Sequence, residues 1–293
     1  MVGRIMLKQL SLLSICALPL SAGEPLPLWP DLAPDETSRN TGELQPFREG
    51  EVPPVNRVIN IRKPSFTMHA PTKPNGTGVV ILPGGGFGKV VTNKEGTEAA
   101  AWLNRHGVTA FVLSYRTKVA KTDPGWKRPL QDAQRMMSLI RSRAAEWGLR
   151  KDRIGLLGFS AGGNVAARLL SADTRAYNAL DRIDRTPFRP DFAMLVYPWT
   201  IYDPASDSLV KGIRVPESCP PTFIVHTDDD RSSSLGGILF YAGLKKHGIP
   251  SEIHVYGNGG HGYGLRPVAG SEISTWPDHA GHWLQRWIDG ASR

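Results

Sequence analysis

The fold of this chain is decided by residues 153–170, which read RIGLLGFSAGGNVAARLL. The apolar run at 153–157 predicts a β-strand, and residues 163–170 predict a helix. Between them, residues 158–162 form a G-x-S-x-G pattern, whose small residues let the backbone turn sharply and lift Ser160 clear of the sheet edge. The start of the following helix favours developing negative charge beside this serine. The alternative is a glycine-rich turn that holds a serine by chance, and the flanking strand and helix count against it.

The rest of the chain continues this alternation of strands and helices. Apolar runs alternate with amphipathic segments, a pattern typical of an α/β fold in which a mostly parallel central sheet has helices on both faces. Strands are expected at 57–61, 65–69, 78–82, 108–113, 192–197, 222–226 and 252–256, and helices at 95–105, 130–147, 233–246 and 277–288.

The N-terminal residues 1–23 predict a secretory signal peptide. Arg4 and Lys8 form a basic start, an apolar run covers residues 10–20, and small residues follow at 21–23. The run is too short to span a bilayer, and the bulky residue before its cysteine argues against a lipid anchor. We therefore expect a secreted or periplasmic protein with no membrane anchor, and a buried N-terminal helix is the less favoured alternative.

The start of the mature chain is expected to be less regular. Residues 24–56 are rich in Pro, Glu and Asp and predict an extended arm on the surface. Residues 57–61 and 65–69 predict two strands joined by a turn at Lys63-Pro64, which suggests an antiparallel start to the sheet. Because no internal repeat or low-complexity linker follows, we expect one domain over residues 24–293.

The charge of the chain argues against a nucleic-acid partner. The formal net charge is +8, and removal of residues 1–23 leaves +6. The Lys and Arg residues are scattered and form no run with interleaved aromatic residues, so a solvated basic surface is expected, with weak attraction to acidic polymers as the alternative. The mature chain retains only Cys219, so an intramolecular disulfide is excluded and the core must supply the stability.

A glycine-rich loop at residues 83–87, PGGGF, follows the expected strand at 78–82. Glycines let backbone N–H groups point into a site without obstruction by side chains. A phosphate-binding loop would need glycine at position 83 and serine or threonine after Lys89, and neither is present. An oxyanion hole fits better: amides of this loop and of Ala161 would stabilise a tetrahedral oxyanion, and one such donor is worth about 2.7–4 kcal/mol in the transition state.

A single histidine, His261, lies in the loop Gly-Gly-His-Gly-Tyr-Gly at 259–264, after the expected strand at 252–256. Glycines on both sides predict an exposed, mobile imidazole, as a general base requires. Metal binding has little support because no second ligand follows at metal-site spacing.

Three aspartates at 228–230 follow the expected strand at 222–226. A carboxylate that orients an imidazole completes a serine-histidine site, and the chain order Ser160, aspartate, His261 is that of α/β sheets with a serine elbow. The residues alone leave open which aspartate serves. A cation site or a solvated loop is the alternative for this acidic triplet.

The chain resembles the α/β-hydrolase superfamily, and within it secreted acetyl esterases and acetylxylan or feruloyl esterase-like proteins. The similarity runs from about residue 28 to the C-terminus. Its motifs are 82–87 (LPGGGF), 114–116 (SYR), 158–163 (GFSAGG), 197–198 (YP) and 260–264 (GHGYG).

This resemblance implies a role for each matched residue and no cofactor. Ser160 takes the position of the nucleophile and His261 that of the base. Asp230 takes the acid position, because the family's aspartate sits four residues after the position that His226 holds here. The resemblance also implies that the oxyanion amides belong to Gly85, Gly86 and Ala161.

Two departures from the family pattern bear on these roles. Many relatives have histidine where this chain has Pro83, so the packing of the loop is expected to differ. Relatives often have proline after the acid, whereas Arg231 follows here, and this keeps Asp229 open as the alternative to Asp230.

The substrate is less well determined. The connection from Tyr197 to Pro221 is too short for a large hydrophobic lid, which favours a small-molecule or polysaccharide ester such as acetylated xylan. Trp199 and Tyr202 are candidates for a sugar platform, with ordinary packing of a short cap as the alternative. Feruloyl ester hydrolysis and a serine peptidase of the same fold are the competing activities, and a non-catalytic binding protein would be expected to lose Ser160 or His261.

Overall fold

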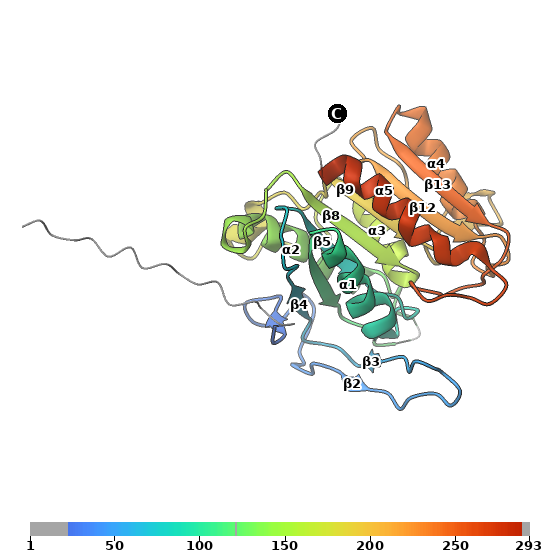
Figure 1. Ribbon diagram of the computed structural model, residues 1–293. Helices are drawn as coiled ribbons and strands as arrows, with labels where there is room; N and C mark the ends of the chain where they lie inside the picture. Colours follow the sequence, from blue (N-terminus) through green and yellow to red (C-terminus); the bar gives the residue numbers. More distant parts are fainter. Residues whose placement is uncertain (1–22, 121, 289–293) are drawn as a thin grey trace, which may run out of the picture.

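A computed structural model describes residues 23–120 and 122–288 of the chain (Figure 1). Its centre is an eight-stranded sheet, in which the six strands from β7 to β13 are mutually parallel, while β1 and β4 run antiparallel to their neighbours. The strands, in spatial order, are β1 (Leu26–Pro27), β4 (Ser65–His69), β7 (Thr109–Ser114), β5 (Gly78–Leu82), β8 (Ile154–Phe159), β9 (Phe192–Val196), β12 (Thr222–Thr227) and β13 (Ser251–Tyr256).

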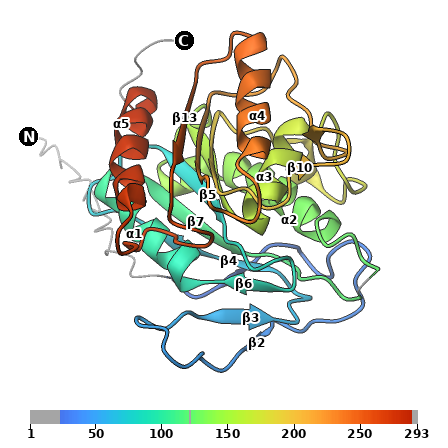
Figure 2. The same ribbon diagram turned by 90° about the vertical axis from the view of Figure 1, so that its right-hand side faces the viewer.

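Helices cover both faces of this sheet, as expected from the sequence (Figure 2). One apolar cluster packs α2 (Lys127–Ser142), α3 (Ala161–Ser171) and α4 (Leu235–Lys246) onto one face. A second cluster packs α1 (Glu98–Arg105) and α5 (Trp276–Ile288) onto the other. Strand β8 serves both clusters, since Leu156 belongs to the first and Leu157 to the second, which is the alternation of a strand buried on both sides.

Shorter elements complete the described chain. A π-helical turn (Asn93–Thr97) precedes α1, and 3-10 turns cover Ala144–Trp147, Arg182–Arg185 and Glu272–Thr275. The strands β10 (Tyr202–Asp203) and β11 (Ser208–Leu209) form a two-stranded hairpin. No helix in the described ranges is long and apolar enough to cross a membrane.

A separate small sheet contains the first of the two early strands expected at residues 57–69. Strand β3 (Arg57–Ile59) pairs antiparallel with β2 (Glu43–Leu44) and β6 (Lys89–Val91), whereas β4 pairs with β1 and β7. Strand β4 gives the central sheet the expected antiparallel start, but the two early strands belong to different sheets. Asn60 has a positive φ of 56° and Ile61 is fully buried in the core, so the chain bends away from β3 before it enters β4.

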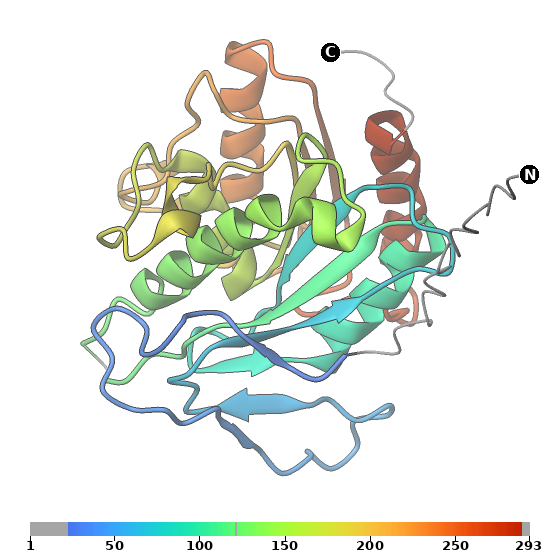
Figure 3. The same cartoon turned by 90° about the vertical axis from the view of Figure 1, so that its left-hand side faces the viewer.

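The arm at residues 24–56 is also more than a surface segment (Figure 3). Its strand β1 forms the edge of the central sheet, and its residues Leu28 and Trp29 are buried in the core. The Trp29 indole Nε1 donates to the Asp132 carboxylate at 2.9 Å, and Asp132 also forms a fully buried ion pair with Arg116. The expected signal peptide at 1–23 lies outside the described residues, apart from Gly23.

Candidate active site

The serine elbow lies between β8 and α3. Ser160 has φ 51° and ψ −118°, a conformation that is costly for any residue with a side chain and is held by its surroundings. The flanking glycines explain why this turn can form. A Cβ on Gly158 would lie 2.6 Å from the Gly162 carbonyl oxygen, and a Cβ on Gly162 would lie 2.0 Å from the Leu82 oxygen.

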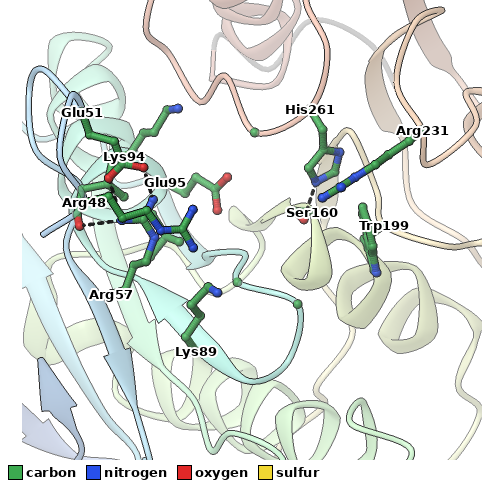
Figure 4. Close-up of a pocket in the computed structure, with 15 residues that line it drawn as sticks. Arg48, Glu51, Arg57, Lys89, Lys94, Glu95, Ser160, Trp199, Arg231 and His261 are labelled. Atoms are coloured by element: carbon green, nitrogen blue, oxygen red, sulfur yellow. Dashed lines mark hydrogen bonds and ion pairs between the residues drawn. The ribbon is translucent and has the colours of Figure 1, made fainter. Parts of the chain in front are cut away.

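The structure brings Ser160, His261 and Asp230 together. The Ser160 Oγ lies 2.7 Å from the His261 Nε2 (Figure 4), and the His261 Nδ1 lies 2.6 Å from the Asp230 Oδ2. The imidazole therefore connects a hydroxyl on one side with a carboxylate on the other. Asp230 and Ser160 are both buried, and Ser160 and His261 line an open pocket.

The Asp230 carboxylate is held ionised by its hydrogen bonds. Burial alone would raise its pKa, but hydrogen bonds from His226, His261 and the Ser232 amide outweigh burial and hold the pKa well below its ordinary value. The His226 Nε2 lies 3.0 Å from the same Oδ2 that faces His261, and the Ser232 N–H donates to Oδ1 at 2.8 Å. The family resemblance assigned His226 no role beyond marking the acid position, although its place four residues before the aspartate was the signal for this contact.

Asp229, the alternative acid, contacts a different group. Its two carboxylate oxygens accept the N–H groups of Gly259 at 3.2 Å and Gly260 at 2.8 Å. Asp229 thus holds the backbone of the histidine loop, whereas the carboxylate against the imidazole is that of Asp230.

The glycine loop packs closely against the serine, since a Cβ on Gly84 would lie 2.6 Å from the Ser160 Cβ. Gly85 has φ 134°, and a Cβ there would lie 2.2 Å from the Lys89 carbonyl oxygen. Gly85 and Gly86 line the same pocket as Ser160, and Ala161 is the first residue of α3. Two of the residues expected to supply oxyanion donors, Gly85 and Gly86, thus share a pocket with Ser160.

A buried carboxylate, that of Glu95, links this loop to the loop at residues 259–264 that carries His261. Nothing in the sequence indicated a role for Glu95. Its Oε2 accepts the Gly84 N–H at 2.6 Å, and its Oε1 accepts the Tyr197 hydroxyl at 2.9 Å. The Tyr197 oxygen in turn accepts the Gly264 N–H at 2.9 Å. Burial raises the pKa of Glu95, although these hydrogen bonds act in the opposite direction. No local motif marks this residue, because its partners come from distant parts of the chain.

The pocket in front of Ser160 has a volume of about 400 Å³. The Trp199 ring lies at its wall, with its centroid 4.9 Å from that of His261 in an edge-to-face arrangement. Tyr202 is not among the lining residues, and its hydroxyl donates to Asp207 at 2.9 Å. Of the two aromatic residues expected at the substrate, the structure brings only Trp199 to this pocket. The lining residues are Arg48, Glu51, Val55, Arg57, Gly85, Gly86, Lys89, Val91, Lys94, Glu95, Ser160, Trp199, Arg231, His261 and Gly262.

Comparisons with known proteins agree with this architecture. Residues 67–187 match the family model described as BD-FAE. The chain is 26% identical over 230 residues to an acetylxylan esterase of Xylanibacter ruminicola, which covers 69% of this chain and 44% of the relative. It is 30% identical over 204 residues to endo-1,4-beta-xylanase B of Butyrivibrio fibrisolvens, and this match covers 63% of this chain and 32% of the relative. The chain thus spans less than half the length of either relative.

Solved structures extend the similarity to nearly the whole chain. An acetyl ester-xyloside bifunctional hydrolase from Caldicellulosiruptor lactoaceticus superposes with a TM-score of 0.66 and 28% identity, covering 90% of this chain and 96% of the other. An alpha/beta hydrolase enzyme from a Medee basin deep-sea metagenome library shares the fold at 22% identity, with a TM-score of 0.63 and coverage of 85% and 100%. The chain is therefore a protein of the α/β-hydrolase fold, and residues 67–187 carry its match to the BD-FAE family.

Proposed function

We propose that this protein is a serine esterase that removes short acyl groups, acetyl in particular, from carbohydrate esters such as acetylated xylan. The observation that carries the proposal is the pair of hydrogen bonds that join Ser160 to His261 and His261 to Asp230 beside an open pocket. A buried carboxylate, an imidazole and a hydroxyl in this order form the arrangement that activates a serine for attack on an ester.

The chemistry proceeds in two halves. The His261 Nε2 takes the proton of Ser160 while the hydroxyl oxygen bonds to the ester carbonyl carbon, and the ionised Asp230 stabilises the imidazolium that forms. Amides of Gly85, Gly86 and Ala161 are proposed to stabilise the oxyanion. His261 then gives its proton to the leaving alcohol, and water releases the acyl group from Ser160 by the same steps. No step requires a cofactor.

Two observations support a short acyl group on a carbohydrate. The connection between β9 and β12 carries the short hairpin of β10 and β11 in place of a large lid. Two similar proteins are described as an acetylxylan esterase and an acetyl ester-xyloside hydrolase. The predicted signal peptide at 1–23 supports export to where such polysaccharides occur.

The first experiment measures hydrolysis of 4-nitrophenyl acetate by the wild-type protein and by Ser160→Ala. We expect the variant to lose several orders of magnitude in kcat, because the nucleophile is gone. A variant as active as the wild type would remove Ser160 from the mechanism.

The second experiment identifies the natural ester. Acetate release from acetylated xylan is compared with ferulate release from feruloylated arabinoxylan under the same conditions. We expect acetate release to be the faster reaction, and faster release of ferulate would move the proposal to a feruloyl esterase.

A further inference from the structure

Cationic side chains gather around the pocket in front of Ser160. Five of its lining residues are basic, namely Arg48, Arg57, Lys89, Lys94 and Arg231, and two are acidic, namely Glu51 and Glu95. The first four basic residues belong to the small sheet and its flanks, across the pocket from Ser160, while Arg231 lies on the His261 side beside Trp199 (Figure 4). Basic residues that are scattered along the sequence thus line one pocket in the fold.

The two acidic residues are already committed to other partners. Glu51 forms a two-point ion pair with Arg57, at 2.7 and 2.5 Å. Glu95 is buried and accepts the hydrogen bonds of Gly84 and Tyr197. Within the described parts of the chain, Arg48, Lys89, Lys94 and Arg231 form no ion pair. The pocket therefore carries an excess of positive charge that the described chain does not balance.

This excess charge is costly where it is partly removed from water. Burial lowers the pKa of Lys89, and the positive charges of Arg48 and Arg57 lower it further. Burial also lowers the pKa of Lys94, although the negative charges of Glu95, Glu51 and Glu98 act in the opposite direction. Removing two ammonium groups partly from water costs free energy. An anion placed among them would offset both the desolvation and the repulsion through charge-assisted hydrogen bonds.

We propose that the pocket selects an ester that carries a carboxylate close to the ester group. When the carboxylate is on the alcohol part of the ester, an example is an acetylated uronic acid of a polysaccharide. The inference rests on the proposed esterase function and specifies its substrate class. The ester carbonyl lies at Ser160, and the carboxylate lies among the ammonium and guanidinium groups that line the pocket. A neutral sugar of the same size would leave those charges unbalanced.

The experiment uses two matched pairs of esters. The first pair, acetylated methyl galacturonide and acetylated methyl galactoside, places a carboxylate or a hydroxymethyl group on the alcohol side. The second pair, mono-4-nitrophenyl succinate and 4-nitrophenyl butyrate, places the carboxylate or a methyl group on the acyl side. We expect kcat/KM at low salt to be about tenfold or more higher for the anionic member of one pair. A charge-assisted hydrogen bond to the carboxylate provides enough free energy for this difference. This preference should shrink in 0.5 M NaCl.

The outcomes separate the two proposals. A preference in the first pair identifies an anionic sugar, and a preference in the second identifies an anionic acyl group; both support carboxylate recognition. Equal rates, or faster hydrolysis of the neutral members, overturn this inference and leave the esterase function standing. Failure to hydrolyse any of the four esters overturns this inference, and failure on 4-nitrophenyl acetate as well overturns the esterase function.

A charge variant tests which residues are responsible. In Lys89→Gln/Lys94→Gln, the ratio of kcat/KM between the anionic and the neutral ester should fall severalfold, because two of the cationic groups are lost and the guanidinium groups remain. The ratio is taken within one preparation, so a partial loss of folded enzyme cancels from it. The matched control is Lys245→Gln, an exposed lysine in the last turn of α4 outside the pocket, which should keep the wild-type ratio. An unchanged ratio in the double variant would overturn the assignment of the site.

Discussion

The His226 Nε2 donates to the Asp230 Oδ2 at 3.0 Å, and the His261 Nδ1 lies 2.6 Å from the same oxygen. An ionised carboxylate can only accept hydrogen bonds, so both facing ring nitrogens carry protons. His226 is fully buried, and its Nδ1 has no hydrogen-bond partner within the described residues. Its one polar contact is therefore with Asp230, and it fixes the direction in which that carboxylate points.

The first prediction concerns this positioning contact. His226→Phe should lower kcat for 4-nitrophenyl acetate about tenfold with little change in KM, because one hydrogen bond to a charged group is lost. His226→Gln should lose less, since its amide can still donate. A His226→Phe variant with wild-type kcat, or equal losses in the two variants, would contradict a positioning role.

The second prediction separates the two aspartates. Asp230→Asn should reduce kcat by about 10⁴, because the imidazole loses the carboxylate that holds its tautomer. Asp229→Asn should stay within about tenfold of the wild type, since its remaining oxygen can still accept a loop N–H. Steady-state kinetics on one ester decide the ranking, and the reverse order would assign the acid role to Asp229.

Local patterns were sufficient to predict the parts of the molecule that are built locally. The strands at 65–69 and 78–82 coincide with β4 and β5, because a continuous apolar or alternating run is itself the signal. Ser160 and the glycine loop could be located from their glycines, because the backbone there lies too close to other segments for a side chain to fit.

Contacts between distant segments could not be predicted in this way. The pairing of β3 with β6 joins Arg57 to Val91, and nothing in the sequence of residues 57–69 excludes a hairpin. Glu95 contacts Tyr197 across more than a hundred positions, and Arg48 reaches the pocket from the arm. Composition reports how many charges exist, whereas the fold decides which of them share a pocket.

The third prediction follows from the polar walls of the pocket. Each methylene of a longer acyl chain gains about 0.8 kcal/mol only when it enters an apolar environment. Charged side chains such as Lys89 and Arg231 line this pocket, so that gain should be absent. We expect kcat/KM for 4-nitrophenyl acetate to exceed that for the octanoate by about tenfold or more, and a preference for octanoate would contradict a short-acyl esterase.

The last prediction concerns Glu95, which connects the glycine loop to Gly264 through Tyr197. Glu95→Gln keeps an oxygen that can accept the Gly84 N–H but places a donor group where the Tyr197 hydroxyl now donates. Because burial opposes the charged form of Glu95, the neutral residue should cost little in the free energy of unfolding.

The kcat of Glu95→Gln should nevertheless fall about tenfold, since the link between the two loops is disturbed. Urea denaturation and steady-state kinetics on the same preparation test this combination. If Glu95 were purely structural, its variant would lose activity only in proportion to its loss of stability. That result, or a variant with full activity, would contradict a role in positioning the two loops around Ser160.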